Sequence, residues 1–148
     1  MSRVRSKDTG PELTVRRLLH SLGFRFRLHR RDLPGTPDIV LPRHHVAVLV
    51  HGCFWHGHDC SLFRMPATRT EFWKAKIDAN RHRDAEVRSD LLSEGWRTLC
   101  VWECAIRGSA RLSSDDLAMQ IITFLSERQN EGDIAGHWDT KSRERIDA

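Results

Sequence analysis

The sequence lacks any run of apolar residues long enough to cross a lipid bilayer, and it contains no internal repeat and no linker. A membrane-spanning helix needs about 20 consecutive apolar residues. The first ten residues, MSRVRSKDTG, are basic and polar, and the apolar stretch of a signal peptide does not follow them. These absences lead us to expect a cytoplasmic protein rather than a membrane or secreted one.

Cysteine is scarce, with four residues at Cys53, Cys60, Cys100 and Cys104. Because the cytosol disfavours disulfides, these cysteines are better explained as metal ligands or as buried thiols. Cys100 alternates with its neighbours in the apolar stretch TLCVW, so we interpret it as a small buried hydrophobic residue in a strand.

The composition is that of a soluble globular protein, with 39% hydrophobic and 30% charged residues in a chain of 148. This length allows one compact domain with a single core. The net charge of +4 and the isoelectric point near 9.2 favour an anionic partner such as nucleic acid. Charge alone is weak support, because many basic proteins bind no nucleic acid.

The pattern of apolar and helix-breaking residues predicts elements in the order α-β-β-β-α-β-α. The predicted helices cover residues 9–23, 70–95 and 114–127, and the predicted strands cover 24–29, 39–42, 46–50 and 96–104. Thr9 and Glu12 have capping-box spacing at the start of the first helix, and Gly23 ends it. Three strands with tight connections are expected to be antiparallel, whereas the fourth follows a helical crossover and is expected to be parallel.

This order predicts an α/β fold in which a mixed β-sheet is flanked by helices. We expect a single domain over residues 1–128. Residues 129–148 have no hydrophobic periodicity, so we expect a loosely ordered C-terminal tail there.

A possible metal centre stands out in the segment VHGCFWHGHDC. Cys53, His58 and Cys60 fall within eight residues, and Cys104 follows the last predicted strand. Three thiolates and one imidazole form a closed tetrahedral zinc set. The spacing is not a common zinc-finger pattern, and the alternative is two unrelated buried cysteines beside a polar loop. We favour structural zinc, which can supply about 10–16 kcal/mol of folding free energy.

A closed zinc site leaves no position for substrate, so catalytic chemistry must come from other residues. Asp38 begins a predicted strand directly after Pro37, where a rigid carboxylate suits a hard ion such as Mg²⁺, although a lone aspartate there is more often a turn residue. His51 is expected near Asp38 if the two strands pair across Pro42. A neutral His56 can take a proton from an attacking water.

Two acidic residues have alternative interpretations. Glu12 is either a helix-capping residue or an active-site acid, and Asp84 either orients a histidine or lines a solvated helix face. Several basic residues are candidates for phosphate contacts, or else form a solvated charged face: Arg25, Arg27, Arg30, Arg31, Lys74 and Lys76.

Four segments together resemble the very short patch repair (Vsr) DNA mismatch endonucleases: PGTPDIVLP, VHGCFWHGHDC, PATRTEFWKAKI and GWRTLCVWEC. The resemblance extends over roughly Lys7 to Leu125. It implies a restriction-endonuclease-like fold, whose αβββαβ core agrees with the order above. It also implies an enzyme that nicks one strand of duplex DNA 5′ to the thymine of a T:G mismatch, the product of 5-methylcytosine deamination.

The resemblance also implies a role for each candidate residue. Mg²⁺ is expected on the Asp38 carboxylate and the backbone carbonyl of Val50. His56 is expected to activate water, with support from His51, Asp84 and Glu12. Structural zinc is expected on Cys53, His58, Cys60 and Cys104. The side chains expected to intercalate beside the mismatch are those of Phe54, Trp55 and Trp73.

Intercalation is energetically plausible for these aromatic residues. Burying one aromatic side chain contributes at most about 4–6 kcal/mol, whereas opening a base step costs on the order of a few kcal/mol. For Trp73, a core position on its helix is the alternative.

The expected partner is double-stranded DNA containing a T:G mismatch, bound by a monomer that also works with other mismatch-repair proteins. Two other functions fit part of the pattern. A zinc-stabilised, non-catalytic binder of distorted DNA needs the charge and the aromatics but leaves Asp38 and His56 without a role. A sequence-specific restriction nuclease of the same fold has to cut both strands of matched DNA.

Overall fold

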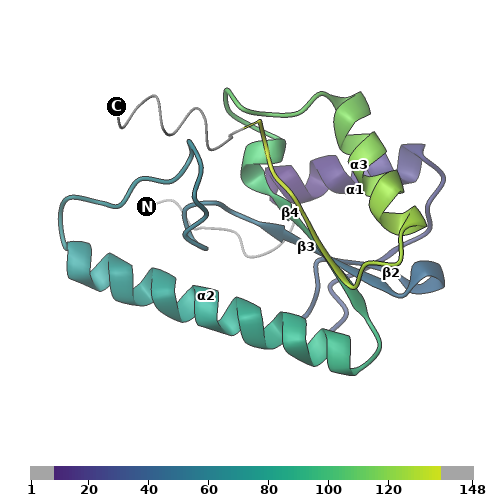
Figure 1. The fold of residues 1–148 in the computed structure, drawn as a ribbon, viewed down its shortest axis with the longest axis horizontal. Helices are drawn as coiled ribbons and strands as arrows, with labels where there is room; N and C mark the ends of the chain where they lie inside the picture. The colour runs from purple at the N-terminus through teal and green to yellow at the C-terminus, as the bar shows by residue number, and fades with distance from the viewer. Residues whose placement is uncertain (1–8, 138–148) are drawn as a thin grey trace.

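The computed structural model describes residues 9–137, which form a five-stranded sheet with helices on both sides (Figure 1). The helices are α1 (Gly10–Ser21), α2 (Thr70–Ser93) and α3 (Ser114–Ser126), with short 3-10 helices η1 (Pro42–His44) and η2 (Glu103–Ala105). The strands are β1 (Arg27–Leu28), β2 (Ile39–Leu41), β3 (Val46–His51), β4 (Arg97–Trp102) and β5 (Glu131–Ile134).

The sheet has the order β1-β2-β3-β4-β5, and its strand directions are mixed. β1, β2 and β3 pair antiparallel, whereas β4 lies parallel to β3 after the crossover through α2. This arrangement confirms the predicted α/β class, with its mixed sheet flanked by helices. It also aligns the C-terminal ends of β3 and β4, where His51 pairs with Trp102.

Helix α1 begins and ends where its sequence signals predicted. The Thr9 hydroxyl oxygen accepts a hydrogen bond from the backbone N–H of Glu12 at 3.3 Å, which satisfies one of the free donors of the first turn. After the last turn, Gly23 has a φ of 84°, a left-handed conformation that glycine adopts at little cost.

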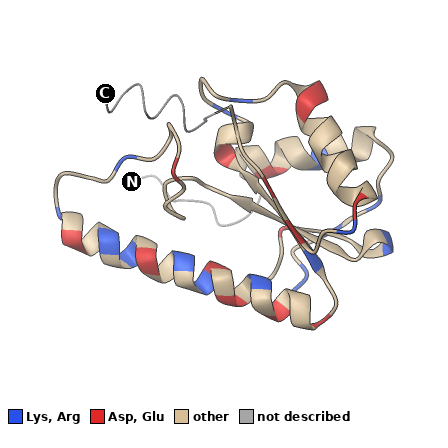
Figure 2. Ribbon diagram, viewed as in Figure 1, with Lys and Arg blue, Asp and Glu red and all other residues tan. Residues whose placement is uncertain are grey.

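The main core lies between one face of the sheet and the pair α1 and α3, as Figure 1 shows. Val15 and Leu19 of α1 and Ile121 of α3 are almost fully buried there. Helix α2 lies on the other side of the sheet, where only Ile77 and Leu91 of its residues are buried. Most of α2 is therefore exposed, and its surface alternates basic and acidic residues (Figure 2).

Strand β5 corrects the expectation of a loose tail from residue 129. Glu131–Ile134 pairs parallel with β4, and Ile134 is buried, so the folded domain extends past residue 128. The strand is short and polar, and it is held partly by side chains: Asp133 accepts hydrogen bonds from Arg88 at 2.7 Å and from the Trp102 indole at 3.1 Å. The rest of the predicted tail, residues 138–148, lies outside the described residues.

Strand β1 is shorter than the predicted strand over residues 24–29. Phe24 and Phe26 nevertheless pack against the main core, whereas Leu28, the third alternate apolar residue of the predicted strand, is 39% exposed. Among residues 9–137, no helix combines the length and the apolar character needed to cross a membrane.

Candidate active site and metal centre

The first group of candidate residues gathers where β3 runs past the end of β2. Asp38 directly precedes β2, and its Oδ2 accepts a hydrogen bond from the backbone N–H of Val50 in β3 at 2.8 Å. Backbone N–H and C=O groups of one strand residue face the same edge. The Val50 carbonyl is therefore directed toward the Asp38 side as well, in keeping with the role that the resemblance implied.

Glu12 and His29 complete a group that we call the carboxylate site (Glu12, His29, Asp38). Glu12 is only 1% exposed, and its Oε1 lies 2.5 Å from His29 Nε2 and 3.1 Å from the Arg16 guanidinium. One ligand atom from each of the three residues lies within 4.8 Å of the others. The side chain of Glu12 thus reaches the neighbourhood of Asp38, while its backbone N–H serves the helix cap.

Burial raises the pKa of Asp38 to about 6, because a charged carboxylate loses hydration inside the protein. The Val50 N–H opposes this effect, and the nearby Glu12 carboxylate adds to it. A concentration of negative charge in a partly buried place favours a cation, which would relieve the repulsion between the two carboxylates.

The raised pKa of Asp38 predicts a pH-dependent stability effect. The folded protein favours the neutral form, so the Asp38 contribution to stability is present below pH 4 and is lost as the pH rises through 6. In buffer without divalent ions, Asp38→Asn is expected to raise the free energy of unfolding by at most about 3 kcal/mol above pH 6, and to have little effect near pH 4. Thermal melts of both proteins at pH 4 and pH 7 measure the difference. An equal difference at both values would contradict it.

The second group contains His51, His56 and Asp84, whose ligand atoms also lie within 4.8 Å of one another. His56 Nδ1 lies 2.5 Å from Asp84 Oδ2, and the His51 and His56 rings stack with centroids 3.9 Å apart. Burial raises the pKa of Asp84, but the hydrogen bond from His56 and nearby positive charges outweigh it, so the net pKa falls below its ordinary value. An ionised Asp84 fixes the proton of His56 on Nδ1 and leaves Nε2 as a base.

His51 is held in its neutral form. Burial lowers the pKa of His51 to about 3, with a further decrease from the neighbouring His56. Its Nδ1 lies 3.4 Å from the sulfur of Cys100, which is fully buried in β4 as the sequence predicted. A neutral, packed His51 gives His56 a firm stacking surface.

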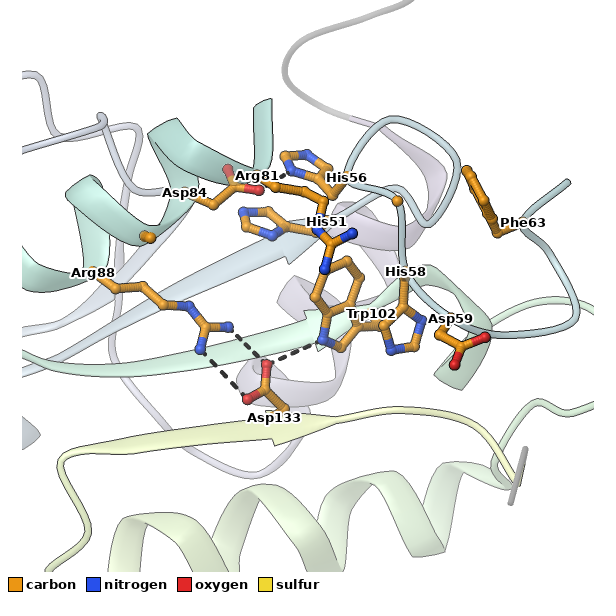
Figure 3. A pocket seen from close by; sticks show the side chains of 12 residues that line it. His51, His56, His58, Asp59, Phe63, Arg81, Asp84, Arg88, Trp102 and Asp133 are labelled. Atoms are coloured by element: carbon orange, nitrogen blue, oxygen red, sulfur yellow. Dashed lines mark hydrogen bonds and ion pairs between the residues drawn. The ribbon is translucent and has the colours of Figure 1, made fainter. Parts of the chain in front are cut away.

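The two groups share one cavity of about 620 Å³, which Asp38, His51, His56 and Asp84 all line, together with Arg31 and Arg83. A second cavity of about 690 Å³ also borders His51, His56 and Asp84, and is lined in addition by Arg88, Trp102 and Asp133 (Figure 3). Asp38 is part of the first cavity and not of the second. Of these two cavities, the first therefore brings Asp38 together with the His56–Asp84 pair.

The second candidate centre is the cysteine–histidine cluster (Cys53, His58, Cys60, Cys104), whose ligand atoms lie within 4.8 Å of one another. His58 Nδ1 is 3.6 Å from the sulfurs of both Cys53 and Cys104. A hydrogen bond from Cys53, together with one from His58, lowers the pKa of Cys104 below that of an ordinary thiol. The cluster can hold a metal ion, and its four donors come from the loop after β3 and from η2 after β4.

Backbone donors support the sulfurs of this cluster. The N–H of Cys104 donates to the Cys53 sulfur and the N–H of Gly136 donates to the Cys104 sulfur, both at 3.3 Å. A Cβ at Gly136 would meet the Cys104 carbonyl oxygen at 2.4 Å, so only glycine allows this close approach. The segment after β5 therefore contributes directly to the cluster.

The predicted intercalating residues form an aromatic cluster (Phe54, Trp55, Trp73) outside the main core. Phe54 lies 5.2 Å from Trp55 and 5.5 Å from Trp73 between ring centroids, and Trp55 lies 5.9 Å from Trp73. All three are partly exposed. Trp73 packs with the loop aromatics rather than with the core residues, which differs from the alternative core interpretation.

The loop segment of residues 53–60, which carries Phe54 and Trp55, is held at several points. Cys53 and Cys60 are buried in the cysteine–histidine cluster, and the Asn80 side chain on α2 donates to the Trp55 carbonyl at 2.9 Å. Lys76 of α2 lies 5.7 Å from the Trp55 ring centroid. A rigid, partly exposed aromatic edge next to basic residues suits contact with nucleic-acid bases.

Sequence reasoning missed His29 and the Arg88–Asp133 ion pair as parts of these sites. His29 is the last residue of the predicted strand 24–29, and nothing in the local pattern indicates that its ring turns toward Glu12. The backbone φ of His29 is 46°, a left-handed conformation that differs from that of a strand and so redirects its side chain. Asp133 lies in the segment that was expected to be loose.

The chain is similar to known DNA endonucleases. A family model described as DNA mismatch endonuclease Vsr matches residues 1–62. The chain is 56% identical over 106 residues to the type II nicking enzyme V.XorIIP of Xanthomonas oryzae, a match covering 72% of this chain and 78% of that protein. It is 44% identical over 125 residues to the DNA mismatch endonuclease Vsr of Escherichia coli, with 84% and 80% covered. It is 40% identical over 110 residues to the nicking enzyme V.NmeAIP of Neisseria meningitidis, with 74% and 79% covered.

Proposed function

The chain belongs to the Vsr family of DNA mismatch endonucleases, and on that premise we propose that it nicks duplex DNA 5′ to the thymine of a T:G mismatch, with Mg²⁺ as cofactor. Because the chain belongs to this family, it is a DNA endonuclease of the nicking type. The specificity for a T:G mismatch and the use of Mg²⁺ are what we propose. The observation that carries it is that Asp38 and the hydrogen-bonded His56–Asp84 pair line the same cavity.

The carboxylate site fits a divalent ion, since Asp38 and Glu12 supply oxygens beside the Val50 backbone. Mg²⁺ prefers such oxygen ligands and keeps several of its waters. Asp38 and Glu12 would hold the ion, which would supply Lewis-acid stabilisation of negative charge at the phosphate. Arg31 and Arg83 line the same cavity, and we propose that they contact the flanking phosphates.

His56 is proposed to activate the attacking water. Its Nδ1–H donates to Asp84 at 2.5 Å, so Nε2 accepts the proton of the water as the bond to phosphorus forms. The stacked ring of His51 holds the plane of His56. Asp84 then stabilises the protonated imidazole, as an orienting carboxylate does in other acid–base pairs.

The cysteine–histidine cluster is proposed to hold structural zinc. Three sulfurs and one imidazole nitrogen form a closed tetrahedral set, which leaves no position for water or substrate. The ion would tie the loop after β3 to η2, and so place both His56 and the aromatic cluster. In this proposal zinc contributes to catalysis only by positioning.

The aromatic cluster is proposed to enter the base stack beside the mismatch. A T:G pair is more easily opened than a matched pair, so wedge insertion costs less there than elsewhere. We propose that the protein acts as a monomer, because one active site suffices for a nick in one strand, and that other mismatch-repair proteins act after it.

Trp55→Ala is expected to weaken binding to a T:G duplex by about 10-fold to 100-fold, since stacking on one aromatic residue contributes about 1–3 kcal/mol. Binding to the matched C:G duplex is expected to change less than threefold, because it depends mainly on phosphate contacts. Fluorescence anisotropy with labelled duplexes measures both affinities. The matched control is Trp96→Ala, a tryptophan that packs against His45 away from the cluster. Equal losses on both duplexes would contradict the wedge role.

Nick mapping tests the proposed activity. Each strand of a T:G duplex is end-labelled in turn and incubated with the protein in Mg²⁺ or in EDTA. A single cut 5′ to the mispaired thymine, lost in EDTA, supports the proposal. Cuts in both strands of a fully matched duplex would identify a restriction nuclease instead, and tight binding without cleavage would identify a non-catalytic binder.

A further inference from the structure

His29 brings an imidazole nitrogen into the carboxylate site. Its backbone N–H donates to the Asp38 carbonyl at 3.1 Å, which ties the end of β1 to the residue before β2. Its ring Nε2 lies 2.5 Å from Glu12 Oε1, and its side chain is 21% exposed. His29 and Asp38 line the same cavity. The ring is therefore directed into the site and is reachable from solvent.

The spacing of the donors fits one ion. An octahedral ion with bonds of about 2.1 Å holds adjacent donors about 3 Å apart and opposite donors about 4.2 Å apart. The ligand atoms of Glu12, His29 and Asp38 lie within 4.8 Å of one another, so small side-chain adjustments bring all three to a single ion. The positions that remain are available to water and to a phosphate oxygen.

We propose that His29 is a third protein ligand of the active-site ion, and that the site consequently prefers Mn²⁺ and Co²⁺ to Mg²⁺. The inference rests on the proposed function, in which Asp38 and Glu12 hold the ion. Mg²⁺ favours an all-oxygen set, whereas an imidazole nitrogen strengthens binding of transition ions in the order Mn²⁺ then Co²⁺.

A simpler role for His29 is a hydrogen bond that orients Glu12. The two roles differ in what a glutamine can replace. Glutamine keeps a side-chain N–H for the Glu12 carboxylate, but its amide does not supply an imidazole nitrogen to an ion. His29→Gln therefore removes the nitrogen ligand and retains the hydrogen bond, and any amide oxygen it offers to an ion gives no directly bonded nitrogen.

The test measures metal binding by the full-length protein, purified without chelator so that the cysteine–histidine cluster stays intact. Calorimetry gives the affinities for Mn²⁺ and Mg²⁺, and pulsed electron paramagnetic resonance of bound Mn²⁺ reports a directly bonded nitrogen. The wild type is expected to bind Mn²⁺ at least about 10-fold more tightly than Mg²⁺, and to show the nitrogen signal. His29→Gln is expected to lose the signal and most of the Mn²⁺ preference.

Three further variants separate the outcomes. His82→Gln, an exposed histidine on α2, is the matched control and is expected to keep the wild-type affinities. A nitrogen signal that survives in His29→Gln but disappears in His56→Gln would overturn the inference, because the ion would then lie on the other histidine group. If Asp38→Asn leaves Mn²⁺ and Mg²⁺ binding unchanged, the proposed ion site itself is wrong. If Asp38→Asn weakens ion binding but His29→Gln changes neither the nitrogen signal nor the affinities, His29 is not a ligand and the inference is overturned. The proposed function then stands without it.

Discussion

Replacing Asp38 with asparagine is expected to reduce the single-turnover rate of nicking by about 1,000-fold or more. Each 1.36 kcal/mol of lost transition-state stabilisation is a tenfold loss in rate, and a bound ion contributes several kcal/mol at a phosphoryl centre. Asparagine can still accept the hydrogen bond from Val50, so the local fold is retained. The charge that attracts the ion is removed.

This prediction separates catalysis from binding. Affinity for the T:G duplex is expected to change by less than about threefold, since the aromatic cluster and the basic residues are untouched. Asp90→Asn is the matched control, because Asp90 is an exposed carboxylate near the far end of α2. Nicking by Asp38→Asn at a rate within tenfold of the wild type would mean that the ion is held elsewhere. Rapid-quench assays with enzyme in excess measure the rates.

Replacing Cys104 with alanine is expected to release the metal ion and lower the stability severely. Structural zinc supplies about 10–16 kcal/mol in small domains, so losing one of four ligands is expected to cost at least about 5 kcal/mol. For a chain of this size, that corresponds to a fall in melting temperature of about 10–20 °C. Nicking is also expected to fall, because His56 lies between Cys53 and His58 on the same loop.

Cys100 provides a matched control, because it lies in β4 only four residues before Cys104. Cys100→Ala removes a fully buried thiol from β4 that lies outside the cysteine–histidine cluster. This variant is expected to keep one bound ion, and to lose the packing of one small side chain together with its sulfur contact to His51. Elemental analysis gives the metal content and circular dichroism gives the melting temperature. A Cys104→Ala protein that retains a full equivalent of metal would refute the assigned ligand set.

Local signals explain which parts of the fold could be predicted from the sequence. The Thr9 cap and the turn at Gly23 act within a few residues, so the bounds of α1 followed from them. The closeness of Asp38 to β3 followed from a short turn that forces two neighbouring strands to pair. Cys53, His58 and Cys60 are near in sequence, and only Cys104 required the parallel pairing of β3 and β4 to join them.

Features that depend on distant contacts were missed. Strand β5 has one buried apolar side chain, Ile134, and is stabilised through Asp133 by residues of α2 and β4, so its own four residues have no periodicity to detect. His29 enters the carboxylate site through a left-handed backbone conformation, and Glu12 meets it 17 positions away along the chain. Such arrangements depend on tertiary structure and leave no local pattern.

The most direct test of the proposed mismatch-dependent nicking is a competition between two duplexes that differ only in a T:G or a C:G pair. Both are present in one reaction with Mg²⁺, each labelled with a different fluorophore, and the comparison is repeated in several flanking contexts. We expect that, in at least one context, the T:G duplex is nicked 5′ to its thymine while the C:G duplex stays intact. Equal nicking of both duplexes in every context would contradict it.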